Sequence, residues 1–380
     1  MLSLMFFRVK FAAVEFKRKS NMQIGIVGFP LSGKSTLFNT LLRNRVGESE
    51  YKSKQQTVRG VISVQDERLD RLTALFNPRR KVPAAVEYVL VPGLDSRSEK
   101  GFSPDFFSRL KTVDEILLVV RAFENEFYSL PEEKADSRRD IGFAMSEFIL
   151  SDMMIIERRI ERLEKQLKKL RNADDEAELR LLKKCLTVLE SEKPLRVMDL
   201  NDDERKRLQG YQFLSMKPIL IVLNIDEDRL SDTENIEHDF RNYADDNVTV
   251  MALCLKIESE IAELDDDDQR MFLDELGIRE PAVYRLVRKS YDLLGLISFF
   301  TVGEDECRAW TIRSGLSAQQ AAGVIHSDLE RGFIRADVVR WDDLLRKGSL
   351  AACRSEGLLR LEGKDYIVRD GDVMEIRFNV

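Results

Sequence analysis

The stretch from Gly28 to Thr36, GFPLSGKST, matches the pattern GxxxxGK[ST] that binds nucleotide phosphates. Gly28 and Gly33 allow the main chain to curl so that several N–H groups point inward, and a following helix adds the positive end of its dipole. The side chain of Lys34 would then reach the β- and γ-phosphates, and the hydroxyl of Ser35 would take a position on Mg²⁺. These residue types at this spacing predict a nucleotide-binding protein.

The flanking residues predict the structure that such a loop requires. Residues 24–27 form an apolar run typical of a strand, and residues 37–42 have the apolar spacing of a helix. Further apolar runs predict the other strands of a mainly parallel sheet, at 86–91, 116–120, 218–223 and 248–253. The expected fold class is therefore an α/β P-loop nucleotidase core.

Composition limits the classes of function. The chain of 380 residues is long enough for two or three domains. Its net charge of −7 argues against general binding to nucleic acid, so any such contact requires a local basic patch. Four cysteines without a CxxC pair fit reduced thiols in the cytoplasm, and two histidines exclude a histidine-rich metal site. No apolar run reaches the roughly 18 residues that cross a bilayer, so we expect no membrane association.

Residues 1–21 stand apart from the fold. Arg8 and Lys10 interrupt the apolar start, and a basic cluster at 17–19 follows it, which does not fit a signal peptide. The segment is either a disordered tail or the product of a start assigned upstream of the real one. Because Met22 leads directly into the first predicted strand, we favour the second interpretation.

Residues 146–208 predict an antiparallel helical hairpin. Isoleucine and leucine recur at steps of four and three from Ile156 to Leu170, and leucine again from Leu179 to Leu189, with a break at 172–175. The first arm carries basic residues that could contact a phosphate backbone: Arg158, Arg159, Arg162, Lys165, Lys168, Lys169 and Arg171. Because glutamates interleave with them, a solvated face explains the pattern equally well.

Two positions around the loop bear on the metal. Thr57, after the first helix, is a candidate Mg²⁺ ligand, although a surface-strand threonine explains it as well. P-loop nucleotidases place an aspartate three residues before the glycine that follows the next strand, and here that position is Leu90. Asp95 lies beyond the turn and could substitute, or could be a solvated surface carboxylate. The metal site is therefore incomplete by sequence.

The segment from Asn224 to Glu227, NIDE, ends the strand that would face the base. GTPases use Asn-Lys-x-Asp here, and their aspartate accepts two N–H groups of guanine. Ile225 replaces the lysine and Glu227 the aspartate, and the longer glutamate displaces the carboxylate. We therefore expect guanine selection to be weakened or lost.

The phosphate loop, the hairpin insert, the NIDE segment and the C-terminal part together resemble the YchF (Obg-like ATPase) family of P-loop nucleotidases. The most specific part is the family's TGS domain, which residues 296–303, 308–313, 321–328 and 330–336 resemble almost residue by residue. The resemblance covers 22–380. It implies an Obg-type nucleotidase domain at 22–145 and 209–296, a coiled-coil insert at 146–208, and a β-grasp TGS-like domain at 297–380.

The resemblance also implies roles for individual residues. Lys34 is the catalytic candidate, and Ser35, with Thr57 as a further candidate, would hold Mg²⁺. Asn224 and Ile225 would contact the base. The phosphates would be wrapped by Leu31, Ser32, Gly33, Lys34, Ser35 and Thr36.

The family implies binding of ATP at least as tight as that of GTP. It also implies a ribosome or ribosomal RNA as partner, through the TGS domain and the basic hairpin arm, in the cytoplasm. Leu94 matches the hydrophobic residue that the family has where Ras-like proteins place a water-orienting glutamine. This chain departs from the family at Leu90, at 95–100 and at 54–57.

Two functions therefore remain open. The first is a slow ATPase or GTPase associated with the ribosome or with translation. The second is a nucleotide-responsive binding module with little or no hydrolysis, whose function the TGS domain carries. These two functions differ in whether the protein hydrolyses the nucleotide, and the loss of the metal-site aspartate leaves that open.

The C-terminal part holds three local predictions. Residues 366–368 and 374–378, joined by a turn at Asp370-Gly371, predict a β-hairpin. Trp310 and Phe333 could stack on RNA bases, but core packing is favoured. His326 could lie on a binding face or be a hydrogen-bonded structural histidine.

Overall fold

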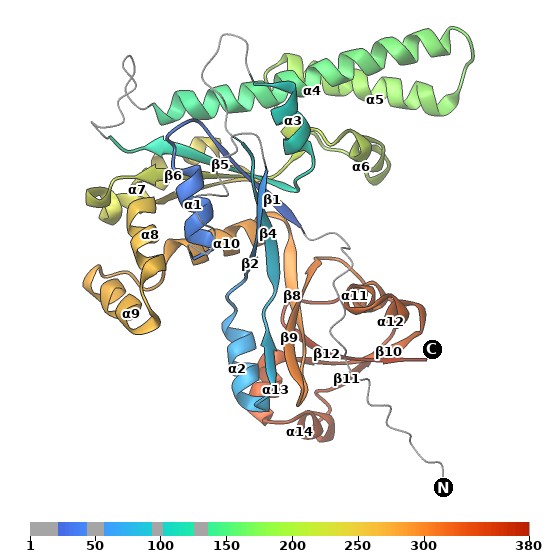
Figure 1. Ribbon diagram of the computed structural model, residues 1–380. Coiled ribbons are helices and arrows are strands. Elements are labelled where there is room, and N and C mark those ends of the chain that lie inside the picture. Colours follow the sequence, from blue (N-terminus) through green and yellow to red (C-terminus); the bar gives the residue numbers. More distant parts are fainter. Residues whose placement is uncertain (1–21, 44–56, 93–101, 125–135, 380) are drawn as a thin grey trace.

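The computed structural model describes residues 22–43, 57–92, 102–124 and 136–379. Two six-stranded sheets form the centres of the two halves of the molecule, and a long helical hairpin extends from the first half (Figure 1). The proposed N-terminal extension at 1–21 lies outside the described residues. Within the described ranges, no helix is both long and apolar enough to cross a bilayer.

The first sheet, here called the core sheet, has the strand order β2-β4-β1-β5-β6-β7. Strand β2 is antiparallel to β4, and all other neighbours are parallel. Residues 116–120 are 0% exposed, as expected for a strand covered on both faces. The strands are β1 (Gln23–Gly28), β2 (Val58–Ser63), β4 (Ala85–Leu90), β5 (Glu115–Ala122), β6 (Ile219–Ile225) and β7 (Val248–Leu253). The predicted α/β class with a mainly parallel sheet is confirmed.

Helices cover both faces of the core sheet. Alternate residues of β5 join two different clusters: Leu117 and Val119 pack with one set of helices, and Ile116 and Leu118 with the other. The first set includes α1 (Lys34–Leu41) and α10 (Ala282–Leu293); the second includes α3 (Pro104–Lys111), α4 (Ser137–Leu167), α7 (Thr233–Asp239) and α8 (Leu255–Glu263). Helix α9 (Asp266–Glu275) follows α8.

A carboxyl group is fully buried at the start of β5. Glu115 is 0% exposed, and its Oε1 accepts a hydrogen bond from the hydroxyl of Ser290 at 2.7 Å. Its Oε2 and the buried hydroxyl of Tyr88 have no partner among the described residues. Burial raises the pKa of Glu115 well above 4.5, and the Ser290 hydroxyl opposes this only in part. The structure therefore favours the neutral acid at this position.

We expect Glu115→Gln to stabilise the protein at neutral pH. In the unfolded chain this group ionises near pH 4.5, whereas the folded state keeps its proton, so stability falls as pH rises from 4.5 toward the raised folded pKa. Glutamine cannot ionise, and each pKa unit avoided is worth about 1.4 kcal/mol. Urea midpoints between pH 5 and 8.5 should show a gain that grows with pH. The exposed Glu190→Gln is the control; a variant less stable than the parent throughout would contradict the expectation.

The predicted helical hairpin is formed by α4 and α5 (Ala173–Glu190), and α6 (Asp202–Leu208) follows it. Ile156 and Leu163 of α4 are spaced by one heptad and are buried against Leu182 and neighbouring residues of α5. Leu170, predicted as an interior position, is instead 73% exposed because α4 ends at Leu167, and that prediction is wrong. Helix α4 starts at Ser137, so the first arm of the hairpin is continuous with the helix that packs on the core sheet.

The second sheet, here called the C-terminal sheet, has the order β11-β10-β12-β8-β9-β3. Its outermost strand, β3 (Arg80–Val82), comes from the N-terminal half and pairs in parallel with β9, Lys81 opposite Cys307. The other strands are β8 (Leu296–Thr301), β9 (Glu306–Arg313), β10 (Phe333–Arg340), β11 (Arg360–Glu362) and β12 (Asp372–Phe378). The helices of this half are α2 (Glu67–Phe76), α11 (Ala318–Ile325), α12 (Ser327–Arg331), α13 (Trp341–Lys347) and α14 (Leu350–Ser355).

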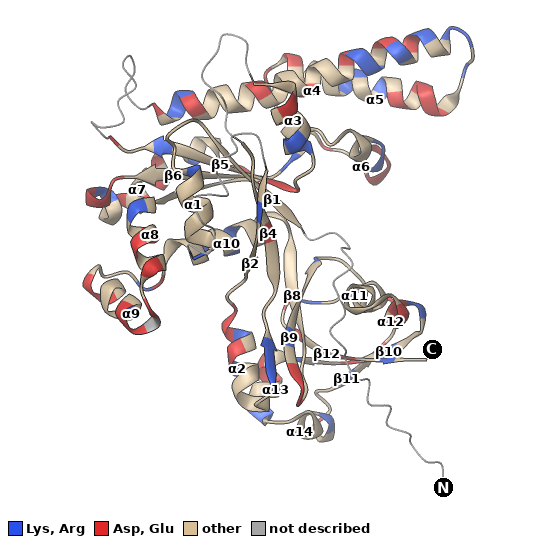
Figure 2. Cartoon of the chain, in the orientation of Figure 1, with Lys and Arg blue, Asp and Glu red and all other residues tan. Residues whose placement is uncertain are grey.

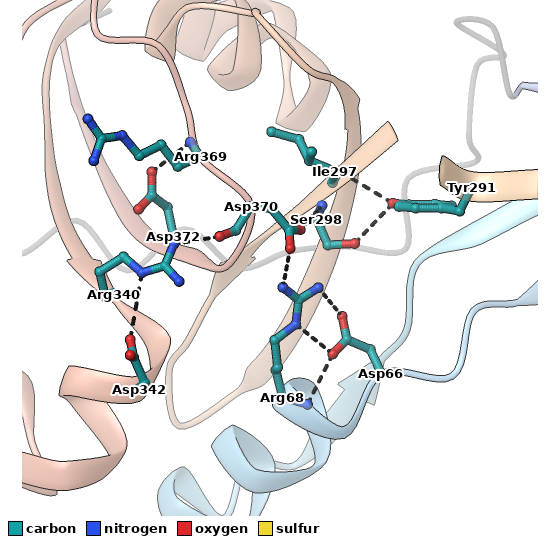
Figure 3. Close-up of polar contacts among 10 residues, drawn as sticks. All are labelled: Asp66, Arg68, Tyr291, Ile297, Ser298, Arg340, Asp342, Arg369, Asp370 and Asp372. Carbon is teal, nitrogen blue, oxygen red and sulfur yellow. Dashed lines mark hydrogen bonds and ion pairs between the residues drawn. The ribbon is translucent and has the colours of Figure 1, made fainter. Parts of the chain in front are cut away.

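An arginine joins α2 to the turn that precedes β12 (Figure 3). Arg68 of α2 binds both oxygens of Asp66, at 2.9 and 2.8 Å, and its Nη1 reaches Asp370 of the C-terminal half at 2.5 Å. The other oxygen of Asp370 accepts a hydrogen bond from Ser298 N at 2.9 Å. Asp370 therefore links α2 to the start of β8.

The β-hairpin predicted at 366–378, with its turn at Asp370-Gly371, does not form. Strand β12 pairs with β10 and β8, and residues 366–368 form only an isolated bridge, from Ile367 to Ser317. The Asp-Gly pair does turn the chain, with Gly371 at φ 85°, but it leads from an irregular segment into β12. The hairpin prediction is wrong because longer-range strand pairing takes the place of the local pairing.

Candidate nucleotide-binding site

The loop between β1 and α1 is curled by two residues with left-handed backbones. Leu31 has φ 64° and Gly33 has φ 98°, a conformation that turns successive N–H groups toward one side. A Cβ atom on Gly33 would lie 2.6 Å from Nδ2 of Asn224, and one on Gly28 would lie 2.4 Å from the carbonyl oxygen of Val119. Both glycines are therefore required by close approach of the loop to its neighbours.

The loop passes directly into the first turn of α1. Lys34 begins the helix, and its Nζ donates to the carbonyl oxygen of Phe29 at 3.4 Å, across the curl of the loop. Ser35 and Thr36 are exposed in the same turn. The N-cap, Gly33, supplies no side-chain acceptor, so this end of the helix offers N–H groups and a positive dipole to an anion. The predicted phosphate residues, 31–36, thus lie together in one turn.

Asn224 at the end of β6 fixes the loop in place. Its side chain is 6% exposed, donates to the carbonyl oxygen of Ser32 at 3.1 Å and accepts from Leu255 N at 3.1 Å. The amide therefore ties the phosphate loop to the start of α8. The side chain of Ile225 is 2% exposed in the core, so a base could be contacted only by its main chain.

Glu227 occupies the position of the guanine-selecting aspartate, and it has a partner. Its Oε1 lies 2.7 Å from Nζ of Lys256, the second residue of α8, and both side chains are exposed. Asp226, before it, accepts from Glu124 N at 3.0 Å. Both carboxylates of the NIDE segment are therefore engaged with protein groups.

The two predicted metal ligands, Ser35 and Thr57, differ in their surroundings. Ser35 lies exposed beside the curled loop, where an ion carried by a triphosphate would meet its hydroxyl. Thr57 Oγ1 instead accepts a hydrogen bond from Nη1 of Arg109 at 2.6 Å. Leu90 is 7% exposed within the apolar core and supplies no oxygen. Leu94 and Asp95 lie outside the described residues.

The described part of the chain forms no metal site from its own acidic, histidine or cysteine side chains. Among the described residues there is no group of three His, Cys, Asp or Glu side chains that could hold a metal ion. Mg²⁺ commonly keeps several waters and is held by one or two protein groups plus substrate phosphates. The hydroxyl of Ser35 fits that kind of site, in which the nucleotide supplies most of the charge.

Sequence reasoning missed two parts of the site. The first is the pairing of Lys256 with Glu227: the sequence predicts a base-stacking loop at 254–258, after the strand at 248–253, but does not predict that contact. The contacts that Phe102 and Phe143 make to Phe29 of the loop had no signal, because the three residues are far apart in the sequence.

The basic residues of the hairpin are interleaved with acidic ones along α4 and α5 (Figure 2). Arg159 is bound by both oxygens of Glu178 at 2.8 Å, whereas the six other basic residues of the predicted arm are exposed. Arg159 is thus engaged within the hairpin, and the others remain candidates for contact with a partner.

Two of the three C-terminal candidates pack against the core of this half, and the third, His326, is exposed and caps a helix. Trp310 donates to Thr301 at 3.0 Å and stacks on Phe299, and Phe333 packs against the same core. His326 caps α12, its Nδ1 accepting from Asp328 N at 3.2 Å. These contacts favour the structural interpretation of all three.

Comparisons with known proteins agree with this geometry. A family model described as "50S ribosome-binding GTPase" matches residues 23–225, and the model YchF-GTPase_C, described as a protein of unknown function, matches 296–379. "Ribosome-binding ATPase YchF" from Bacillus subtilis is 43% identical over 94% of this chain and 99% of its own length. The protein of the same name from Haemophilus influenzae is 40% identical over the same shares. The solved "YchF GTPase" of Schizosaccharomyces pombe has a TM-score of 0.83 and 26% identity, covering 95% of this chain and 99% of its own.

Proposed function

Because the chain belongs to the YchF family, we propose that it is a ribosome-associated P-loop protein that binds ATP and hydrolyses it slowly. The family expected from the sequence motifs is confirmed by relatives that match nearly the whole chain. The observation that carries nucleotide binding is the curled loop of residues 28–36, clamped by Asn224 and opening onto an uncapped helix end. Relatives named for ribosome binding support the partner.

The base that we propose is adenine in preference to guanine. Guanine selection needs a carboxylate free to accept from two N–H groups of the base. Glu227 has one more methylene than aspartate, and its carboxylate is paired with Lys256 at 2.7 Å. We therefore infer that a strong preference for GTP is absent and that ATP binds at least as tightly.

Slow hydrolysis follows from what surrounds the γ-phosphate. Catalysis of phosphoryl transfer depends on positioning and on charge stabilisation by groups such as the metal and the P-loop lysine. Ser35 would hold Mg²⁺ and Lys34 would face the phosphates, and the ion would neutralise charge on the β- and γ-oxygens. The carboxylate that usually steadies the ion is missing, because Leu90 stands in its place. Thr57 remains a second candidate ligand only if its hydroxyl leaves Arg109.

Leu90 also favours a second candidate, a nucleotide-responsive binding module with little or no hydrolysis. In that case the phosphate loop senses the nucleotide, and the TGS-like domain with the exposed basic residues of the hairpin contacts ribosomal RNA. The two candidates share nucleotide binding and differ in turnover.

Titration calorimetry with ATP and GTP, each with Mg²⁺, tests the shared claim. We expect heat for both nucleotides and a dissociation constant for ATP no larger than that for GTP. Phosphate release should be far slower than the roughly 1 per second at the lower end of kinase rates. Sedimentation with ribosomes should show association that changes with the nucleotide. Absence of heat with every adenine and guanine nucleotide would refute the proposal.

A further inference from the structure

An aromatic cluster joins the phosphate loop to α4, the helix that continues into the hairpin. Phe29, the second residue of the loop, is 5% exposed, and its ring centroid lies 6.1 Å from that of Phe102 and 6.0 Å from that of Phe143. Phe102 and Phe143 meet edge to face at 5.5 Å. Each ring thus contacts the other two, in the offset geometries that aromatic rings prefer.

A hydrogen bond strengthens the same junction. Glu147 Oε2 accepts from the main-chain N–H of Phe102 at 2.9 Å. Phe143 and Glu147 lie four residues apart and therefore on one face of α4. Phe106 of α3 packs against Phe102 at 5.1 Å and closes the cluster on its other side. One face of α4 thereby holds Phe102 by both its ring and its main chain.

Further along, α4 is also fixed to the body of the protein by a buried aspartate, in addition to the packing of Ile141, Ala144 and Phe148 on the core sheet. Asp152 is 0% exposed and accepts from the N–H groups of Leu214 at 3.0 Å and Ser215 at 2.8 Å. At a rise of 1.5 Å per residue, Phe143 lies about 14 Å on one side of Asp152, and Leu167 about 23 Å on the other. Figure 1 shows that α4 extends beyond the core sheet into the hairpin. A rigid helix held at Asp152 converts a small shift at Phe143 into a larger shift at the hairpin tip.

We propose that Phe143 and Glu147 are positioning residues of the nucleotide site, through which binding of nucleotide at the phosphate loop moves the helical hairpin. The inference rests on the proposed nucleotide site. A nucleotide that reorders the loop displaces Phe29, the contact of Phe29 with Phe143 displaces the near end of α4, and the helix rotates about Asp152. Linkage requires the reverse effect as well: a partner that fixes the hairpin changes nucleotide affinity, by about 5- to 150-fold for couplings of typical size.

Distance measurement between two spin labels tests this coupling. Leu170→Cys places one label on the tip, where the native side chain is 73% exposed, and Glu275→Cys places the other on the exposed face of α9. The four native cysteines are buried, so labelling of the parent chain measures the background. We expect Mg²⁺ and ATP to shift the mean distance between the two labels by several ångströms, since the tip lies well beyond the pivot.

The variant Phe143→Ala should lose at least half of that shift when the distance is measured at an ATP concentration that saturates the variant. Leu150→Ala is the matched control, because Leu150 is 50% exposed on the same helix and has no ring contact with the loop; its shift should equal that of the parent. Phe143→Leu and Glu147→Gln disturb the packing less, so each should lose a smaller part of the distance change. These two variants test the coupling if Phe143→Ala fails to fold.

Two results would overturn the coupling. In the first, the parent chain binds ATP but the distance between the two labels does not change. In the second, Phe143→Ala, Phe143→Leu and Glu147→Gln all keep the full change in distance. Calorimetry on the same labelled samples separates these from a failure of nucleotide binding itself, which would remove the proposed function together with the coupling.

Discussion

Replacing Lys34 with Ala is expected to weaken the binding of ATP by about 100-fold. Hydrogen bonds to charged groups contribute roughly 1.5–3 kcal/mol each, and 2.7 kcal/mol corresponds to a factor of 100. Nζ of Lys34 spans the loop to the carbonyl oxygen of Phe29 at 3.4 Å, a long bond that a phosphate oxygen would readily replace. The lysine is thus already oriented toward the space that the loop encloses.

Calorimetry with Mg²⁺ and ATP measures this loss directly. The rise in thermal midpoint on adding ATP should also disappear in Lys34→Ala, because a ligand stabilises only the state that it binds. Lys183→Ala removes an equal side chain from the hairpin, where Lys183 pairs with Glu164 at 2.7 Å, and should leave affinity unchanged. Affinity within threefold of the parent in Lys34→Ala would mean that the triphosphate does not occupy this loop.

The parts of this protein that could be predicted are those that neighbouring residues determine. The strand at 23–28, the curl at Gly33 and the helix from Lys34 follow one another without interruption, so their types and order suffice. Buried parallel strands such as β5 can be predicted equally well, because a continuous apolar run is typical of a strand that is buried on both faces. Residues 31–36, which are predicted to wrap the phosphates, lie in one turn for the same reason.

The parts that could not be predicted depend on residues distant in sequence. The family resemblance predicts that Asn224 contacts the base, and the structure shows that its side chain joins the loop to α8 through two hydrogen bonds, one of them to Ser32. Strand β3 leaves the N-terminal half to pair with β9, and no local pattern indicates a partner more than 200 residues away. The Asp370-Gly371 turn was misleading for the same reason, because β12 pairs with β10 and β8 and not with residues 366–368.

The largest effect on stability and catalysis together is expected from Leu90→Asp. Leu90 ends β4 between Ile26 of β1 and Val58 of β2 and is 7% exposed in the core. A carboxylate placed there without a counter-charge should destabilise the fold by several kcal/mol. We therefore expect a clearly lower urea midpoint for the variant in the absence of nucleotide.

Nucleotide and metal should reverse part of this loss. The position of Leu90 is that of the aspartate that supports Mg²⁺ in P-loop nucleotidases, and an ion carried by ATP would offset the buried charge. Mg²⁺ with ATP should therefore raise the midpoint of Leu90→Asp more than that of the parent, and phosphate release should increase at least tenfold. Leu90→Asn is the matched control, since it has the same shape as aspartate without the charge, and it should gain neither effect.

The comparison of these two variants decides between the two proposed functions. If only the aspartate raises turnover, the parent chain has lost a working metal site, and nucleotide binding serves sensing more than hydrolysis. If Leu90→Asp and Leu90→Asn hydrolyse ATP at the parent's rate, then the ion is held without this position, and Asp95 becomes the carboxylate to replace next. In that case Ser35 and a residue beyond Leu90 support the ion, and the slow ATPase is the better description of the protein.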